Sequence, residues 1–69
     1  MKIANGEYAI YGIGEDGRKA KMGGFKVANM KVTTSTSDIV PSGEISSQTA
    51  EKIQRFIDDG HGYIHIEKV

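Results

Sequence analysis

The sequence contains a glycine pattern typical of dinucleotide-binding domains. Residues 12–17, GIGEDG, have the spacing G-x-G-x-x-G and follow a β-prone segment. Dinucleotide binding requires the third glycine to open a helix whose N-terminus meets the pyrophosphate. The residues that follow, RKAKMGG, carry two more glycines and no helical pattern. We therefore interpret these glycines as parts of a twisted hairpin and its turn.

Two histidines with neighbouring aspartates could in principle bind a metal ion. His61 and His65 are four residues apart, and on a helix this spacing would direct both imidazoles to one ion. The glycines on either side of His61 break a helix, and along a strand the two rings would lie about 13 Å apart. The sequence therefore predicts no metal site and no cofactor.

Serines, histidines and acids are all present, so the residue types of a Ser-His-Asp triad exist. Nothing in their spacing places a nucleophile on a strained turn beside a base. We expect no catalytic residues and interpret the chain as a non-enzyme, with a hydrolase or metal enzyme as the weakest alternative.

The charges are balanced in number but unevenly distributed. Nine Lys and Arg match nine Asp and Glu, which argues against a general nucleic-acid coat protein. No acid occurs between Gly17 and Ser37, a stretch that holds five cations: Arg18, Lys19, Lys21, Lys26 and Lys31. Together with the nearby Tyr11, these cations are suited to phosphates and stacked bases. The alternative is that the lysines keep a sheet edge soluble.

A hydroxyl-rich stretch offers a second feature suited to anions. Residues 33–37 are Thr-Thr-Ser-Thr-Ser, and Ser46 stands where a helix is expected to begin, with free amides that attract anions. If the basic hairpin lies near that helix end, the two form a phosphate pocket; otherwise Ser46 is only a cap beside a solvated loop. The candidate ligand-binding residues are Arg18, Lys19, Lys21, Tyr11, Thr34, Thr36 and Ser46.

An acidic pair is predicted at the other end of the same helix. Asp58 and Asp59 fall in its last turn, where the helix dipole disfavours negative charge. Either they are solvated at small cost or they face a cationic partner or a metal ion. With Lys26, they are the candidate partner-binding residues.

One helix is expected to organise the fold. In residues 46–59, Ala50, Ile53 and Ile57 recur at helical spacing with Phe56 at the side, and Gly60 is placed to end the helix. Residues 63–68 alternate apolar and polar side chains, which predicts a half-buried strand that returns to the sheet.

The segments before the helix are predicted to be short strands joined by turns. The dipeptides at 5–6, 16–17 and 23–24 are turn signals, and the second would pair Ile13 with Ala20 and Tyr11 with Met22. Residues 1–4, 7–13 and 25–34 are the predicted strands, the last with a bulge near residues 28–29, and residues 35–45 are predicted to be a loop with Ile39, Val40 and Ile45 as anchors.

These elements predict an α+β fold: one domain over residues 1–69, with a three- to four-stranded antiparallel meander packed by one helix and followed by a C-terminal strand. The chain lacks cysteine and any membrane-length apolar run or signal-peptide core, so a cytoplasmic protein is expected. Because so small a core is marginal, homo-oligomerisation is also expected.

Our leading hypothesis is a small accessory or inhibitor protein that occupies a partner protein or sequesters a ligand, a class that includes products of mobile elements. The alternative is a module that binds a nucleotide or short nucleic acid through the basic hairpin and the hydroxyl-rich loop.

Overall fold

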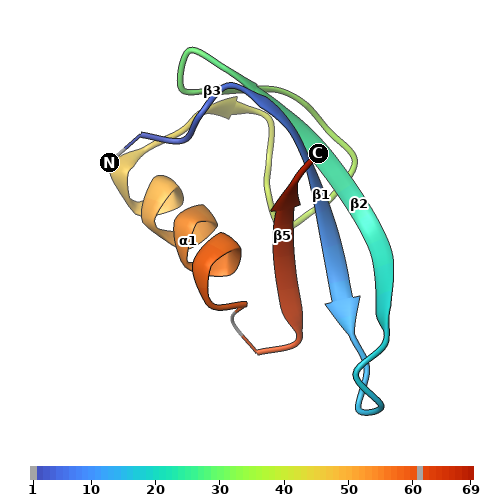
Figure 1. Ribbon diagram of the computed structural model, residues 1–69. Coiled ribbons are helices and arrows are strands. Elements are labelled where there is room, and N and C mark those ends of the chain that lie inside the picture. Colours follow the sequence, from blue (N-terminus) through green and yellow to red (C-terminus); the bar gives the residue numbers. More distant parts are fainter. Residues whose placement is uncertain (1, 61) are drawn as a thin grey trace.

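A single amphipathic helix lies across one face of an antiparallel sheet in the computed structural model, which describes residues 2–60 and 62–69 (Figure 1). The elements are β1 (Gly6–Ile13), β2 (Lys19–Ala28), β3 (Lys31–Ser35), β4 (Gly43–Glu44), α1 (Ser47–Asp58) and β5 (Ile64–Lys68). The strand order is β4-β3-β2-β1-β5, so the predicted α+β class is confirmed and the sheet has five strands.

The helix forms where its apolar spacing predicts it. Ser46 is the N-cap, and its hydroxyl oxygen accepts a hydrogen bond from the amide of Thr49 at 3.2 Å. Ala50, Ile53 and Phe56 are the buried residues of α1. The chain leaves the helix through Gly60 in the left-handed region, with φ of 61°. Twelve residues with a charged outer side make α1 too short and too polar to cross a membrane.

The core lies between the stripe of α1 and the inner face of the sheet. Ile10 of β1 and Ile66 of β5 are paired across the two strands, and both side chains are fully buried. Tyr8 and Phe25 pair across β1 and β2, and their rings stack with centroids 5.0 Å apart. The C-terminal strand therefore returns to the sheet as predicted, and it does so beside β1.

The first predicted hairpin is absent. Residues 2–5 lie outside the strands, and Gly6 begins β1 instead of closing a turn. The side chain of Asn5 accepts a hydrogen bond from the amide of Asn29 at 2.9 Å. Asn5 therefore links the start of β1 to a distant turn, where a local Asn-Gly hairpin was expected.

That distant turn corrects the long strand predicted over residues 25–34. Asn29 and Met30 have φ of 51° and 58°, and the chain reverses there between β2 and β3. Two successive positive φ values are typical of a type I′ hairpin turn. The apolar phase slip that indicated a bulge near residues 28–29 is therefore mainly the mark of a turn, although a register shift does occur between Lys26 and Val27.

The glycine pair at 23–24 does not form a turn. Both glycines lie inside β2, which continues from Lys19 to Ala28. The register of the β1–β2 hairpin shifts between Ile10 and Tyr11, so Tyr11 pairs with Lys21 and Ile13 with Lys19. The predicted pairing of Tyr11 with Met22 was wrong by one residue, because Met22 is the extra residue of a bulge.

The segment predicted as a loop over residues 35–45 is largely irregular, as expected, but contains the two-residue strand β4. Its apolar anchors are confirmed, since Val40 and Ile45 are buried and Ile39 packs against the core. Ser35 belongs to β3, and its hydroxyl donates to the carbonyl of Val40. The loop is thus held against the edge of β3.

The cap gives a first test of the fold. We expect Ser46→Ala to lower the free energy of unfolding by about 1 kcal/mol, because an amide of the first turn loses its acceptor. Ser47→Ala is the matched control; Ser47 is exposed at the first helical position, and its change should stay within about 0.5 kcal/mol. Urea unfolding of both variants measures this, and equal losses would contradict the capping role.

Candidate functional site

The face of the sheet that points away from α1, here called the outer face, is organised in cross-strand rows. Since Tyr8 and Ile10 point into the core, the alternate residues of β1 point outward. One row contains Thr34, Lys26 and Glu7, which are directly paired across β3, β2 and β1.

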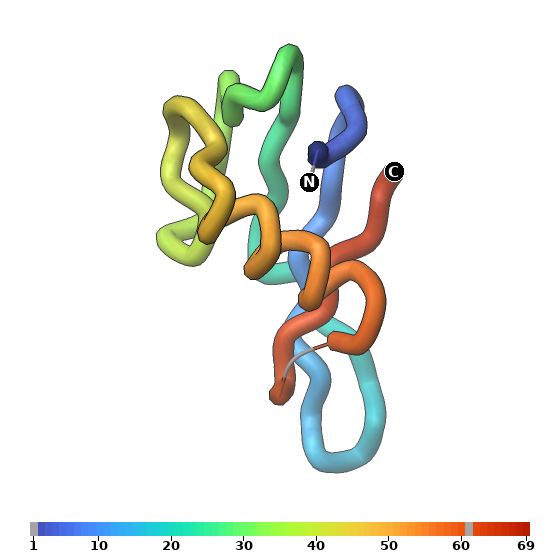
Figure 2. Tube along the Cα trace, turned by 90° about the vertical axis from the view of Figure 1, so that its left-hand side faces the viewer, coloured from blue at the N-terminus to red at the C-terminus, as the bar shows by residue number. Residues whose placement is uncertain are grey.

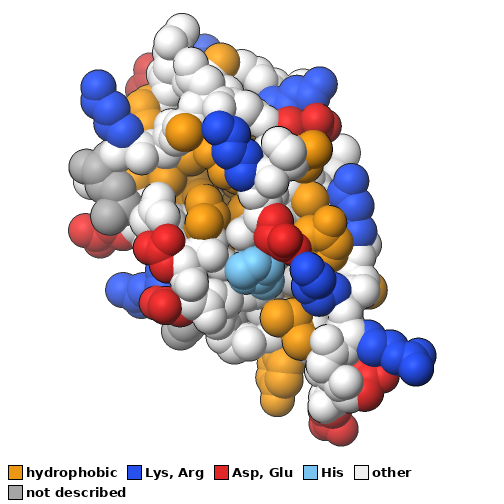
Figure 3. All heavy atoms as spheres, viewed as in Figure 1, with side chains coloured by type: hydrophobic (Ala, Val, Ile, Leu, Met, Phe, Trp, Pro, Cys, Tyr) orange, Lys and Arg blue, Asp and Glu red, His pale blue; other side chains and the backbone are white. Residues whose placement is uncertain are grey.

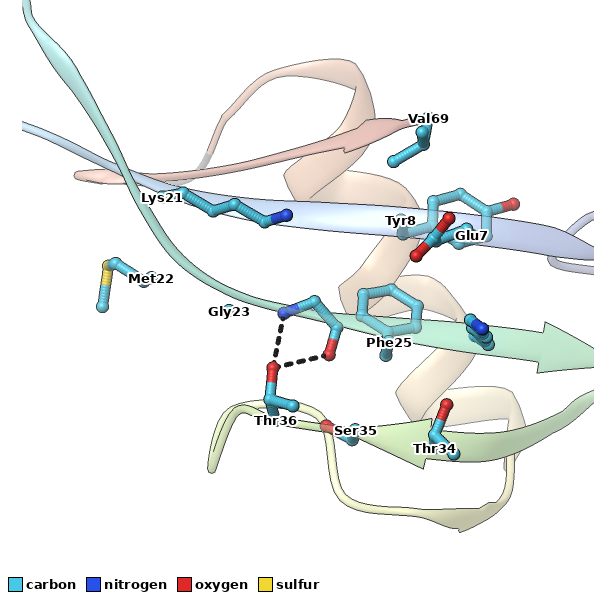
Figure 4. A pocket seen from close by; sticks show the side chains of 12 residues that line it. Glu7, Tyr8, Lys21, Met22, Gly23, Phe25, Thr34, Ser35, Thr36 and Val69 are labelled. Carbon is cyan, nitrogen blue, oxygen red and sulfur yellow. Dashed lines mark hydrogen bonds between the residues drawn. The ribbon is translucent and has the colours of Figure 1, made fainter.

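The next row is nearly empty of side chains. Gly24 of β2 is paired with Ala9 of β1, so nothing larger than a methyl group rises between these two strands. Beyond it, Lys21 pairs with Tyr11. A hollow of about 570 Å³ lies over this low row, with Gly23 and Gly24 as its floor (Figure 4). We call it the glycine hollow.

The glycine floor is enforced by the backbone. A β-carbon on Gly24 would lie 2.7 Å from the carbonyl oxygen of Tyr8, a contact that side chains do not make. Gly23 has φ of 156°, and a β-carbon there would meet Thr36 and Ser37 at 3.2 Å. A side chain at either position would therefore crowd its neighbours, so both positions favour glycine.

The rims of the hollow carry charge and hydroxyl groups. Lys21 and Lys26 stand at its two ends, with Thr34 on β3, Thr36 directly after that strand and Glu7 on β1. Figure 4 shows the Lys21 side chain running along the sheet toward the middle of the hollow. The side chains of the lining include two ammonium groups and one carboxylate, and this net positive charge suits an anion.

Thr36 holds the β3 side of the hollow in place. Its hydroxyl oxygen accepts a hydrogen bond from the amide of Gly24 at 3.0 Å and also lies 3.3 Å from the Gly24 carbonyl (Figure 4). The amide of Thr36 donates to the same carbonyl at 2.9 Å. Thr36 is therefore a structural clamp although it is exposed, and the Thr34 hydroxyl is not engaged with Gly24 in this way.

A neighbouring cluster on the outer face is already internally paired. The ammonium of Lys19 lies 2.6 Å from a carboxylate oxygen of Glu67 and 5.0 Å from the ring centroid of Tyr11. The hydrogen bond between them lowers the pKa of Glu67 and raises that of Lys19, with the opposite charge adding to both effects. One face of the Tyr11 ring therefore already carries the Lys19 ammonium, which competes with a stacked base for that face.

The predicted ligand-binding residues fall into separate groups. Lys21, Thr34 and Thr36 line the glycine hollow together with Lys26, which had been predicted as a partner-binding residue. Arg18 pairs with Asp16 at 3.4 Å in the hairpin turn. Ser46 caps α1. The hollow thus brings together three of the seven predicted residues.

The composite pocket predicted between the basic hairpin and the helix N-terminus does not form. In both Figure 1 and Figure 2 the tip of the β1–β2 hairpin projects away from the start of α1. The reason is the strand order, because β1 and β2 occupy the middle of the sheet while their turn extends beyond the helix.

The acidic pair also stands apart from Lys26. Asp58 ends α1 and Asp59 is its C-cap, whereas Lys26 is on the outer face of the sheet. The side chain of Asp58 accepts a hydrogen bond from Gln54 at 2.8 Å. The three predicted partner-binding residues therefore do not form one surface.

The described residues contain no group of three His, Asp or Glu side chains that could hold a metal ion. His65 is on β5, while His61 lies outside the described residues, so the histidine pair considered from the sequence is not described as a unit.

Sequence reasoning missed the floor of the site and one of its rims. The Gly23–Gly24 pair indicated a turn, although the long β-compatible stretch on both sides was a signal that the strand continues. The sequence around Glu7 did not indicate a binding residue, because its place at the hollow depends on pairing with Lys26 of the neighbouring strand β2.

No protein-family model, curated protein or solved structure matches the chain. The geometry of the outer face is therefore the basis for a functional proposal.

The floor can be tested with two glycine substitutions. We expect Gly24→Ala to lower the free energy of unfolding by about 1–3 kcal/mol, because its β-carbon meets rigid backbone. Gly12→Ala is the control. Its β-carbon would meet only the side chain of Met22, which is 52% exposed and free to move, so the change should stay below about 1 kcal/mol. Similar losses in both variants, measured by urea unfolding, would show that the floor is not special.

The Lys19–Glu67 pair predicts a pH dependence. A carboxyl whose pKa is lowered on folding stabilises the folded state above its ordinary pKa, 4.5, and loses this effect as the pH falls through the lowered value. The difference in Tm between the wild type and Glu67→Gln should therefore be small and positive near neutral pH and should vanish in acid. Glu51→Gln, on the outer side of α1, is the control; a Glu67→Gln difference that does not decline as the pH falls below 4.5 contradicts the assignment.

Proposed function

We propose that this protein is a small non-enzymatic binding protein that sequesters a small anionic ligand in the glycine hollow. The observation that carries the proposal is the placement of Lys21 and Lys26 on opposite rims of a hollow whose floor has no side chains. A flat glycine floor lets a ligand approach the backbone closely, and two ammonium groups supply the charge that an anion needs.

The chemistry of the lining favours a phosphate or carboxylate over a nucleobase. Tyr8 and Phe25 border the hollow, but their rings stack on each other and are only 3% and 2% exposed. One face of the Tyr11 ring carries the Lys19 ammonium. Because stacking of single-stranded bases requires open aromatic faces, the hollow is better suited to the phosphate part of a nucleotide than to nucleic acid.

Glu7 adds a selectivity element to the proposal. It lies directly opposite Lys26 and lines the same hollow, so a ligand with hydroxyl groups beside its anionic group can donate to this carboxylate. A sugar phosphate or a nucleoside monophosphate has both groups. A bare polyanion, in contrast, would be repelled by Glu7.

A ligand titration tests the proposal. AMP at about 1 mM is expected to raise Tm. Inorganic phosphate should raise it less, because it has no sugar hydroxyl to donate to Glu7, and uncharged adenosine should not raise it, because the ammonium groups recognise the anionic part. Lys21→Ala and Lys26→Ala should each weaken AMP binding by about five-fold in calorimetric titration, the loss of one exposed charge contact.

Lys52→Ala is the matched control, since Lys52 is an exposed lysine on α1, away from the outer face. The affinity of the Lys52→Ala variant for AMP should equal that of the wild type. If no anion stabilises the protein, or if Lys52→Ala weakens binding as much as Lys21→Ala, capture in the glycine hollow is ruled out.

A further inference from the structure

The last strand, β5, has one edge without a neighbouring strand, and its hydrogen bonds to β1 show which of its peptide groups point to that edge. β5 has β1 as its neighbour and ends the strand order, at the side of the sheet opposite β3 (Figure 2). Ile13 donates to the carbonyl of Tyr63 at 2.7 Å, and Val69 donates to the carbonyl of Glu7 at 2.8 Å. In an antiparallel ladder the residues in between alternate, so the N–H and C=O of Ile64, Ile66 and Lys68 point away from β1.

The opposite edge of the sheet is protected. β4 has only two residues, and beyond it the loop over residues 36–42 is tied to β3 by the hydroxyl of Ser35, which donates to Val40. Short edge strands and covering loops are common ways to block strand addition. Within the described chain, β5 is therefore the more open of the two edges.

The charged side chains that could guard β5 are directed back over the sheet. Glu67 reaches across β1 to the ammonium of Lys19. The Lys68 side chain lies over Gly6, where a β-carbon would approach its Cε to 2.8 Å. Neither charge therefore shields the backbone edge itself, while Figure 3 shows charged side chains and a histidine gathered on this side of the surface.

We propose that β5 pairs in antiparallel fashion with β5 of a second copy, with the two-fold axis at Ile66. Ile66 then exchanges two backbone hydrogen bonds with its counterpart, and Ile64 does so with Lys68 of the second copy. On the outer face, His65 of each copy lies directly opposite Glu67 of the other, so an imidazole can donate twice, each time to the Glu67 oxygen that does not contact Lys19. The two sheets become one of ten strands.

Charge selects this register over its neighbours. Because only Ile64, Ile66 and Lys68 point outward, the allowed registers differ in steps of two residues. If the pairing is centred on Glu67, the Glu67 side chains of the two copies lie opposite each other, and like charges directly opposite are destabilising. If it is centred on His65, the two His65 side chains lie opposite each other and both His–Glu pairs are lost. The segment Ile64–Lys68 is thus self-complementary only when centred on Ile66.

The dimer is expected to be weak. α1 ends beside the start of β5, where a β-carbon on Gly60 would lie 3.3 Å from Nδ1 of His65 and 3.5 Å from the carbonyl oxygen of Ile64, so the helix end crowds this part of the edge and weakens the outer bonds of the ladder. Pairing brings the Asp58 and Asp59 charges of the two helix ends to the same side of the joined sheet, and their repulsion opposes association. An edge of five residues also makes a small interface, typical of transient association.

The mass in solution is the first test. Light scattering or sedimentation from about 10 μM to about 1 mM should show a 7.5 kDa species that doubles in mass as the concentration rises. Lys68→Pro should abolish the increase, because proline removes an outward N–H without breaking a bond to β1. Lys68→Ala, the control, should retain it. A monomer throughout this range overturns the proposal.

Cysteine trapping tests the register, and the chain has no cysteine of its own to interfere. A mixture of His65→Cys and Glu67→Cys chains should form a mixed disulfide under mild oxidation, because this pair of positions is about 4.5 Å apart between Cα atoms. Each variant alone should crosslink at least ten-fold less. Efficient self-crosslinking of either single variant, without the mixed product, places the axis elsewhere and overturns the assignment.

Discussion

The pairing of β1 with β5 is the interaction on which the rest of the structure depends. It joins residues more than fifty positions apart and places two fully buried side chains, Ile10 and Ile66, side by side. This pairing fixes where α1 must cross the sheet, since the helix is tied to β5 by a short connection. It also makes β1 an interior strand of the sheet, with β2 on one side and β5 on the other.

The distribution of polar groups follows from this arrangement. Among the described residues no Lys, Arg, Asp, Glu or His is buried, so each of these side chains lies at least partly at the surface. The outer face then divides in two. One half is internally paired through Lys19 and Glu67, and the other half, the glycine hollow, keeps two lysines without an ion-pair partner in the described chain. A bound anion would therefore supply a charge partner for the lysines of the glycine hollow, and the Lys19–Glu67 half needs none.

The helix and the last strand could be predicted from the sequence because each has a local signal. The stripe of Ala50, Ile53 and Phe56 and the alternation after residue 63 are properties of contiguous residues. The turns were harder, because Asn5-Gly6 and Gly23-Gly24 have the composition of turns while tertiary contacts keep the chain extended. Conversely, Asn29-Met30 forms a turn that its residue types do not indicate, since methionine seldom adopts positive φ. The site depends on cross-strand neighbours, so only the residue types at its rims were visible beforehand.

The steric origin of the glycine floor has a consequence for how this surface can evolve. A substitution at Gly24 is opposed by the Tyr8 carbonyl, so the depth of the hollow is a property of the backbone and is inherited with the fold. Lys21, Lys26 and Thr34 meet no such restriction, because they are exposed or lie at the margins. Variation can therefore exchange the chemistry at the rims while the cavity persists, and relatives with this sheet would share a shape that accepts different molecules.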